Sequence, residues 1–391
     1  MCDWLSVPSW GDSGSTIMVL LQIAQLPALI IVLAAYHLWL VESLASPSPP
    51  AKGFGTPKTS PLRYTVDDSC QPLIDRLQRS KADLKSVAVG VSLSDTNSGR
   101  QRGLYATKNI KGESIICKIP SDLALALSDP ANGGLDCPTM AHNGASYLRN
   151  FRNQPDWDFY TSSLPTSTSP TPDMFSDEEL ALLEWPWLVE AVKERQEALR
   201  TVTQEDSSID ASELQQATAL VASRSFAITV AEDDKEETTP TDGDNPSMMD
   251  DRGQVITKAG GRRSIRVLLP LLDMANHSGR KANARMTIID PQKDEAWFAL
   301  TATRSIRKGE EICLFYGDTS DALLLNYGFV DDHNSMDKYM VKKNPFAEWT
   351  TTLEEDKTML QMMQEDEDDK GNLESILKLR IQLKQAQLSV D

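Results

Sequence analysis

Short strand-like runs lie on both sides of a long helical block in this chain of 391 residues. Before the block, VAVGVSL at residues 87–93 alternates as a half-buried strand does, and the runs LYAT and ESIICKIP follow after glycine-containing turns. After the block, the same pattern predicts strands at residues 265–269, 285–289, 296–302 and 311–316. The order predicts an α+β fold whose strands come from two separate stretches of sequence.

The central block has the signals of helices. Ser176 precedes three acidic residues and a helical spacing of apolar side chains, which is typical of a helix N-terminus. Helical spacing returns at residues 213–223, so we place a helical insert at about residues 129–222. Residues 231–262 are acidic and rich in Thr, Pro and Gly, with too few apolar residues to pack, and we predict a disordered loop there. Residues 338–391 predict a short helical C-terminal region.

An uncharged apolar segment lies near the N-terminus, at residues 16–41. At about 1.5 Å per residue, a helix of this length could cross a bilayer core of about 30 Å. Lys and Arg occur only on its C-terminal flank, so the segment predicts a single-pass anchor with a cytosolic body. The alternative is a cleaved plastid or secretory leader, because Ser43-Leu44-Ala45 resembles a cleavage site. Residues 1–15 form the flank, and residues 42–69 predict a flexible linker.

Charge and cysteine usage exclude several classes of protein. The net charge of -18 disfavours direct binding to nucleic acid and favours a basic protein partner. The five cysteines form no CxxC pair, so we expect neither a zinc cluster nor a disulfide framework. There is no HExxH motif and no GxSxG motif, which removes the usual zinc-protease and serine-hydrolase signatures.

One polar motif follows directly after an apolar run. Residues 268–272 indicate a buried segment, and Asp273, Asn276 and His277 come immediately after it. A histidine in such a loop is commonly a hydrogen-bonded structural residue. The alternative is that Asn276 and His277 offer polar groups to a small ligand at the end of a strand. Tyr316 and Tyr327 are, taken singly, typical of packed aromatic residues with a satisfied hydroxyl.

Taken in order, five motifs resemble those of the SET-domain protein methyltransferases: RGLYATKNI, SRSF, DMANHS, GEEICLFYG and NYGF. The similarity is greatest to the branch typified by the Rubisco large-subunit lysine methyltransferase, and it runs from about residue 87 to residue 337. It implies a SET domain over residues 70–337, with a knot-like β fold split by the helical insert. It also implies S-adenosyl-L-methionine as the cofactor and no metal.

The same resemblance implies roles for individual residues. Tyr316 would be the catalytic tyrosine, and Tyr327 and Phe329 would line the substrate channel. The cofactor site would consist of Arg102, Gly103, Leu104, Arg224, Asp273, Asn276 and His277.

The implied function is a protein-lysine N-methyltransferase that acts as a monomer on a protein substrate. Tyr327 in the channel wall favours lysine. Two alternatives stay open: a protein-histidine N-methyltransferase, and a non-catalytic SET-like module that binds peptides. A membrane-tethered scaffold that works through its acidic loops is a third class.

Overall fold

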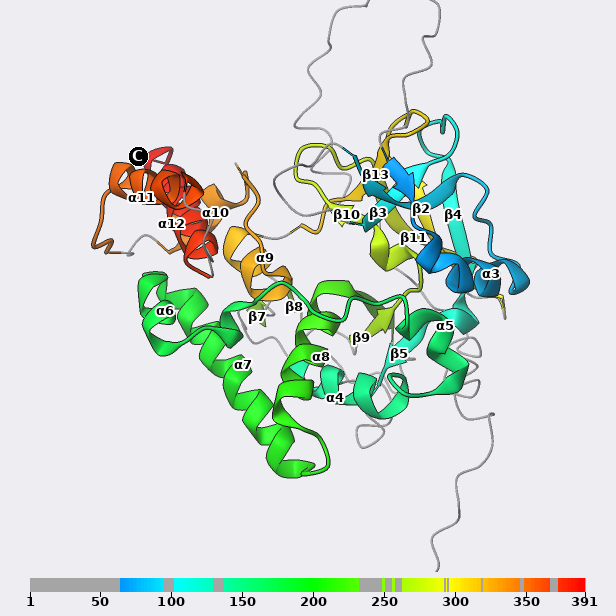
Figure 1. Ribbon diagram of the computed structural model, residues 1–391, viewed down its shortest axis with the longest axis horizontal. Helices are drawn as coiled ribbons and strands as arrows, with labels where there is room; N and C mark the ends of the chain where they lie inside the picture. The colour runs from blue at the N-terminus through cyan, green and yellow to red at the C-terminus, as the bar shows by residue number, and fades with distance from the viewer. Residues whose placement is uncertain are drawn as a thin grey trace, which may run out of the picture.

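The computed structural model describes residues 64–93, 102–128, 137–231, 248–249, 255–256, 262–291, 293, 295–317, 319–332, 334–344, 348–365 and 372–390. The predicted flank 1–15, the predicted anchor or leader 16–41 and most of the acidic loop lie outside these residues. Figure 1 shows the strands of the main sheet gathered in one lobe, with the helical insert in green beneath it. The C-terminal helices, in orange and red, lie beyond α9.

The first strands form where the alternating pattern predicts them. They are β2 (Val87–Ser92), β3 (Arg102–Ala106), β4 (Ile115–Pro120) and β5 (Leu125–Leu127), preceded by α3 (Gln71–Arg79). One boundary of the predicted linker is wrong. β1 (Tyr64–Val66) pairs antiparallel with β2, and the Asp67 side chain caps the next turn, so order begins before residue 70. The Tyr64 ring stacks on Tyr105 at 4.3 Å, which explains why this segment joins the sheet.

The main sheet joins strands from both ends of the sequence. Its order is β1-β2-β3-β13-β11-β12-β4, with β10 paired to β13 at the side. The later strands are β10 (Asn276–His277), β11 (Ala284–Ile289), β12 (Trp297–Ala302) and β13 (Glu311–Leu314). β3 and β13 pair antiparallel with Leu104 opposite Ile312, so residues two hundred positions apart lie side by side. This arrangement confirms the predicted α+β class.

A second sheet, of order β5-β9-β6, connects the two halves. It contains β6 (Ser225–Ala231) and β9 (Arg262–Leu268). These two strands flank the predicted acidic loop and pair over their whole length, from Ser225 opposite Leu268 to Ala231 opposite Arg262. Inside the loop only β7 (Met248–Met249) and β8 (Val255–Ile256) are described. The rest of the loop falls outside the described residues.

The helical insert contains α4 (Met140–Asn150), α5 (Asp158–Thr161), α6 (Asp177–Leu182), α7 (Pro186–Glu205) and α8 (Ala211–Arg224). Ser176 begins α6 with a capping box completed by Glu179, as the sequence predicts. The helical spacing after Ser176 does not give one helix. Glu184 adopts a left-handed φ of 50° and Pro186 starts α7, because proline fits the first turn of a helix but not its interior.

One hydrophobic core unites both halves of the β lobe. It includes Leu104, Ile116, Ile119, Leu268 and Leu300, none more than 2% exposed. Burying each such side chain contributes roughly 1.5–3 kcal/mol relative to exposure. The strands on either side of the polar motif are therefore fixed by one shared hydrophobic core.

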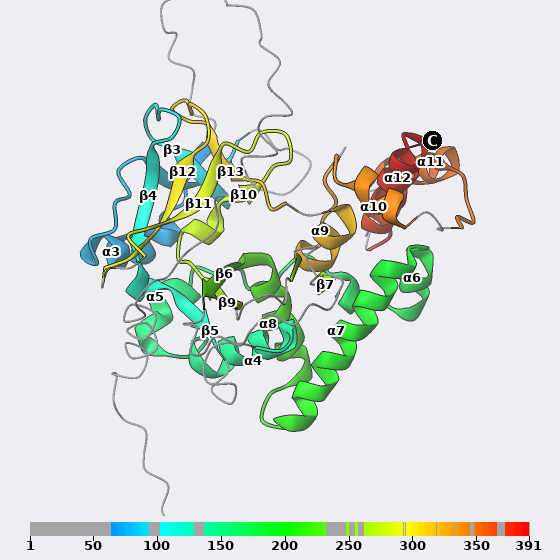
Figure 2. The same cartoon turned by 180° about the vertical axis from the view of Figure 1, so that it is seen from behind.

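The C-terminal helices are α9 (Ser320–Tyr327), α10 (Asp337–Lys343), α11 (Leu353–Glu365) and α12 (Leu373–Leu388). Figure 2 shows α12 near α6 and the first turns of α7, and α7 and α12 share an apolar cluster that includes Leu188, Val192 and Leu379. Behind it, the buried Asp356 carboxylate accepts from both Arg380 and Lys384. The C-terminal region is thus anchored on the insert rather than on the sheet.

The expectation of a single-pass membrane protein with a cytosolic body is corrected by the structure. Within the described ranges no helix has both the length and the apolar content to cross a membrane. The longest helix in these ranges, α7, has 20 residues but carries Glu190, Lys193 and Arg195 near its middle. Residues 16–41, which carried the predictions of an anchor and of a cleaved leader, lie outside the described residues.

Candidate active site

The polar motif is delivered by a strained turn at the end of β9. Leu271 is fully buried with φ 74° and ψ -47°, a sparsely populated backbone conformation that costs a non-glycine residue about 1–3 kcal/mol. The turn reverses the chain so that Asn276 and His277 pair parallel with Cys313 and Leu314 of β13. Core packing supplies the energy that holds this conformation. The end of β13, and with it Tyr316, is thereby brought beside His277.

His277 links this turn to the backbone of Tyr316. The Tyr316 N–H donates to His277 Nδ1 at 3.2 Å, so Nδ1 is unprotonated. His277 Nε2 lies 3.2 Å from Asp331 Oδ2 and carries the proton. Burial lowers the pKa of His277, against the opposing effect of Asp331, so the ring is neutral at pH 7. A neutral ring in this tautomer accepts from the Tyr316 N–H and so fixes the position of the Tyr316 backbone.

Tyr316 is half-buried, and its hydroxyl donates to the Ala275 carbonyl at 2.9 Å. Its ring stacks on Tyr327, with centroids 4.6 Å apart and planes 28° apart. Burial raises the pKa of Tyr316 well above its ordinary value, and the neighbouring Tyr327 adds to the shift. The hydroxyl is therefore neutral at physiological pH, and because its proton is donated to Ala275, its oxygen remains available to accept a hydrogen bond.

The aromatic stack extends to a third ring. Phe329 lies 5.9 Å from Tyr327 and 5.6 Å from His277, measured between ring centroids. Phe315, next to Tyr316, is 46% exposed and lies 5.8 Å from His277. The two residues predicted to line a channel, Tyr327 and Phe329, are thus brought together with Tyr316 and His277. They form an aromatic cluster around the Tyr316 ring.

Arg224 and Asp273 form a buried ion pair beside this cluster. Arg224, the last residue of α8, donates from Nη1 to Asp273 Oδ2 at 3.0 Å. Tyr160 from the insert donates to the same oxygen at 3.0 Å. The Asp273 side chain is fully buried, and burial raises its pKa, whereas Arg224 keeps 23% of its side-chain surface exposed. The guanidinium is the accessible member of the pair.

Asn276 is hydrogen-bonded to the segment at residues 102–104, which was predicted to bind the cofactor. Its Nδ2 donates to the Arg102 carbonyl at 3.0 Å and to Glu311 Oε1 at 2.8 Å. A Cβ on Gly103 would lie 2.6 Å from the Glu311 carboxylate and 2.8 Å from Asn276 Nδ2. Because residue 103 is glycine, the side chains of Asn276 and Glu311 have room to lie against β3.

The side chains of two residues predicted to bind the cofactor, Arg102 and Leu104, have other contacts. The Arg102 guanidinium lies 3.2 Å from Asp67 and donates to the Ser163 carbonyl at 2.6 Å, so it ties β3 to the insert. The Leu104 side chain is fully buried, and its backbone lies between β2 and β13. Leu104 belongs to the core.

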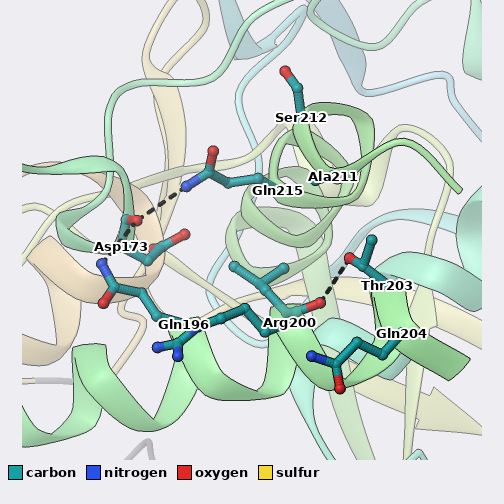
Figure 3. Close-up of a pocket in the computed structure, with 9 residues that line it drawn as sticks. Asp173, Gln196, Arg200, Thr203, Gln204, Ala211, Ser212 and Gln215 are labelled. Carbon is teal, nitrogen blue, oxygen red and sulfur yellow. Dashed lines mark hydrogen bonds between the residues drawn. The ribbon is translucent and has the colours of Figure 1, made fainter. Parts of the chain in front are cut away.

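A cavity lies away from this cluster and shares no lining residue with it. It measures about 610 Å³ and lies between α7 and α8 (Figure 3). No residue predicted from the sequence lines it. Among the described residues there is also no group of His, Cys, Asp or Glu that could hold a metal ion.

The sequence did not single out three residues of the site. Tyr160, Glu311 and Asp331 each bond a predicted residue that is 35 to 113 positions away in the sequence. The only local signal was their position within residues 87–337, which the resemblance covers, and for Glu311 its place in the motif GEEICLFYG.

The profile of the SET domain matches residues 101–317, more than half of the chain. This chain belongs to the SET-domain family. The match begins just before β3 and ends one residue after Tyr316, so it includes Arg102, His277 and Tyr316 and the insert between β3 and His277. Tyr327 and Phe329 lie beyond the matched residues. The match confirms the family inferred from the motifs and the SET fold.

Solved SET-domain structures have the same fold. The SET domain of LSMT bound to lysine and AdoHcy has a TM-score of 0.52 and 16% sequence identity, and covers 83% of this chain and 90% of its own. Rubisco LSMT bound to AdoMet has a TM-score of 0.51 and 16% identity, and covers 83% and 91%. At this identity the likeness concerns the fold. AdoHcy and AdoMet are the molecules bound in those two solved domains.

Similar sequences include the actin-histidine N-methyltransferases. That of Canis lupus familiaris is 33% identical over 97 residues, 25% of this chain and 16% of the relative. That of Drosophila melanogaster is 35% identical over 78 residues, 20% of this chain and 14% of the relative. The chain therefore spans only about a sixth of the length of the curated relatives it matches.

Proposed function

We propose that this SET domain is an S-adenosyl-L-methionine-dependent protein-lysine N-methyltransferase. The observation that carries the proposal is the aromatic cluster at the end of β13, where Tyr316 stacks on Tyr327 beside His277 and Phe329. Rings of this kind can enclose the apolar stem of a lysine while a neutral hydroxyl meets its nitrogen. The substrate would be a protein that presents this side chain.

The residues fit the cofactor. Its carboxylate requires a cation, and Arg224 offers a guanidinium that is still 23% exposed. A Cβ on Gly317, directly after Tyr316, would meet nothing within 4 Å, so there is open space beside the tyrosine. Arg224, Asn276, His277 and the backbone of Arg102 and Gly103 would hold the cofactor. When bound, it supplies a methyl group already activated on a sulfonium.

The protein must then provide alignment and a neutral amine. Alignment of the reacting atoms can contribute about 7–11 kcal/mol. A free lysine has a pKa of about 10.4, so at pH 7 the neutral amine costs about 4.6 kcal/mol. An aromatic channel that excludes water lowers this cost, because it disfavours the ammonium.

Tyr316 contributes its position and its neutrality. Its backbone is held by His277 and its hydroxyl by the Ala275 carbonyl. A hydroxyl kept neutral by burial orients the amine through its oxygen and adds no competing charge. Removing the hydroxyl should leave the cofactor residues in place and misalign the amine.

A second candidate is protein-histidine N-methyltransferase activity. The similarity to the actin-histidine N-methyltransferases favours it, although it covers only a quarter of the chain. An imidazole is already largely neutral at pH 7, so it would need less deprotonation than lysine. The aromatic cluster would accept either side chain.

The two candidates can be separated by the modified residue. Purified protein is incubated with a cell extract and S-adenosyl-L-methionine labelled in its methyl group, and labelled peptides are sequenced by mass spectrometry. We expect methyl-lysine, and a much weaker label with the Tyr316→Phe variant. Methyl-histidine would establish the second candidate, and no transfer to any protein would favour a non-catalytic binding module.

A further inference from the structure

A buried arginine of the insert reaches the end of the helix that carries Tyr327. Arg195 lies on α7, with 5% of its side chain exposed. Its Nη1 donates to the Leu325 carbonyl at 2.8 Å, and its Nη2 donates to Asn326 Oδ1 at 2.6 Å. These acceptors are the two residues before Tyr327. A cation at a helix C-terminus is also favoured by the helix dipole.

The buried carboxylate of Asp173 forms an ion pair with the Arg195 guanidinium. This carboxylate is 1% exposed, and its Oδ1 lies 3.7 Å from Arg195 Nη1. Neither carboxylate oxygen of Asp173 accepts a hydrogen bond from the residues that the structure describes. The positive charge of Arg195 therefore balances the buried carboxylate. Figure 3 shows the Gln215 and Gln196 side chains meeting at Asp173, where both donate to its carbonyl. The backbone at Asp173 is therefore held by α7 and α8.

A second contact holds the other side of Tyr327. Gly328 ends α9 with a left-handed φ of 71°. A Cβ at this position would lie 2.7 Å from the Pro170 carbonyl oxygen and 2.7 Å from Ser169 Cβ. Residues 169–170 belong to the same insert. The insert thus contacts the chain immediately before and immediately after Tyr327.

We propose that the helical insert positions the channel wall, with Arg195 as the positioning residue that sets the orientation of Tyr327 against Tyr316. The assignment of Tyr327 to a substrate channel rests on the proposed function, but the contacts do not. A planar guanidinium is suited to the task because it donates in two directions at once. A lysine would reach one acceptor and leave the other unsatisfied.

The test observes Tyr327 directly. Protein labelled with 3-fluorotyrosine gives fluorine NMR signals for its tyrosines, and the signal of Tyr327 is assigned by its loss in Tyr327→Phe. Arg195→Met alone would leave Asp173 buried without compensation, so the main variant is Arg195→Met combined with Asp173→Asn. We expect the Tyr327 signal, and with it that of Tyr316, to shift or broaden. Signals from the distant stack of Tyr64 and Tyr105 should stay in place.

Two further variants make the result specific. Arg195→Lys should give an intermediate change at Tyr327, because it retains one donor. Arg200→Met removes an arginine from the same helix, one that is 65% exposed and pairs only with Glu197 among the described residues, and should change nothing. A folded double variant with an unchanged Tyr327 signal would overturn the proposal.

Titration of the same samples with AdoHcy separates this inference from the proposed function. If Tyr327 moves but wild-type protein takes up no AdoHcy, the insert positions the ring and the methyltransferase assignment fails. If AdoHcy binds with wild-type affinity and Tyr327 is unmoved in the double variant, the assignment survives and the role of Arg195 fails.

Discussion

Tyr316 and Tyr327 form one stack, but different regions of the molecule hold them. Tyr316 follows β13, and strand pairing, His277 and the Ala275 carbonyl fix its place. Tyr327 ends a short helix, whose last turn is held by Arg195 from the insert. The sheet thus positions the residue proposed for chemistry, and the insert positions the residue proposed for the channel wall.

A buried Arg–Asp pair lies near each of the two tyrosines, and in both pairs the arginine comes from a helix of the insert. Arg224 and Asp273 are 3.0 Å apart and hydrogen-bonded, and Arg195 and Asp173 are 3.7 Å apart. Arg224 keeps part of its surface exposed, whereas Arg195 is buried. The same pair of residue types can thus leave its cation accessible, as at Arg224, or use it to hold the end of a neighbouring helix, as at Arg195.

The largest expected effect is at the Arg224–Asp273 pair near Tyr316. Arg224→Met leaves the Asp273 carboxylate buried without a cation, and it should lower the free energy of unfolding by about 3–5 kcal/mol. The double variant with Asp273→Asn should recover most of that loss, yet still bind AdoHcy weakly. Denaturant titrations of both variants measure this. A single variant as stable as wild type would show that the pair is not structurally important.

Tyr316→Phe should reduce methyl transfer by roughly 10²–10³-fold, by analogy with removal of one oriented hydrogen-bonding group from an active site. AdoHcy affinity should change by less than about threefold, because no predicted cofactor residue is altered. Tyr339→Phe is the matched control, since Tyr339 is 51% exposed on α10. Equal transfer rates in wild type and Tyr316→Phe would remove Tyr316 from the chemistry.

On the insert side, Gly328→Ala should lower the free energy of unfolding by about 1–3 kcal/mol, since its φ is 71° and its new methyl would meet Pro170 and Ser169. Gly317→Ala has a similar φ of 81° but nothing within 4 Å, so it isolates the cost of backbone strain. Thermal unfolding of the pair measures the difference. Equal losses would mean that contact with residues 169–170 contributes nothing.

The smallest effect concerns pH. Burial places the pKa of His277 below its unfolded value of about 6.5, so the unfolded chain takes up the proton first. The contribution of His277 to stability is complete above about pH 6.5, declines as the pH falls toward the folded pKa, and levels off below it. The stability difference between wild type and His277→Gln should narrow on acidification. A difference that widens below pH 6.5 would contradict the neutral assignment.

Much of the fold could be predicted from the sequence because its signals are local. Strand alternation, the capping box at Ser176 and the helix-starting Pro186 are each contained in a few residues. The break between α6 and α7 was readable from Pro186 but was not predicted.

The site could be predicted only in part. The motifs placed Asn276, His277, Tyr316 and Tyr327 together, and the structure agrees. They could not indicate that the Arg102 side chain turns toward Asp67, because that depends on a strand outside the matched region. The partnership of His277 with Asp331 likewise arises only when α9 folds back, 54 residues later in the chain.

We propose that separate segments of the chain surround one cofactor, and calorimetric titration with AdoHcy measures whether they do. We predict a single site per chain in wild-type protein. Asn276→Ala should weaken it by roughly tenfold, because the Arg102 carbonyl and the Glu311 carboxylate lose their shared donor. Arg200→Met should match wild type. Absence of binding to the folded wild-type protein, or unchanged affinity in Asn276→Ala, would contradict the account.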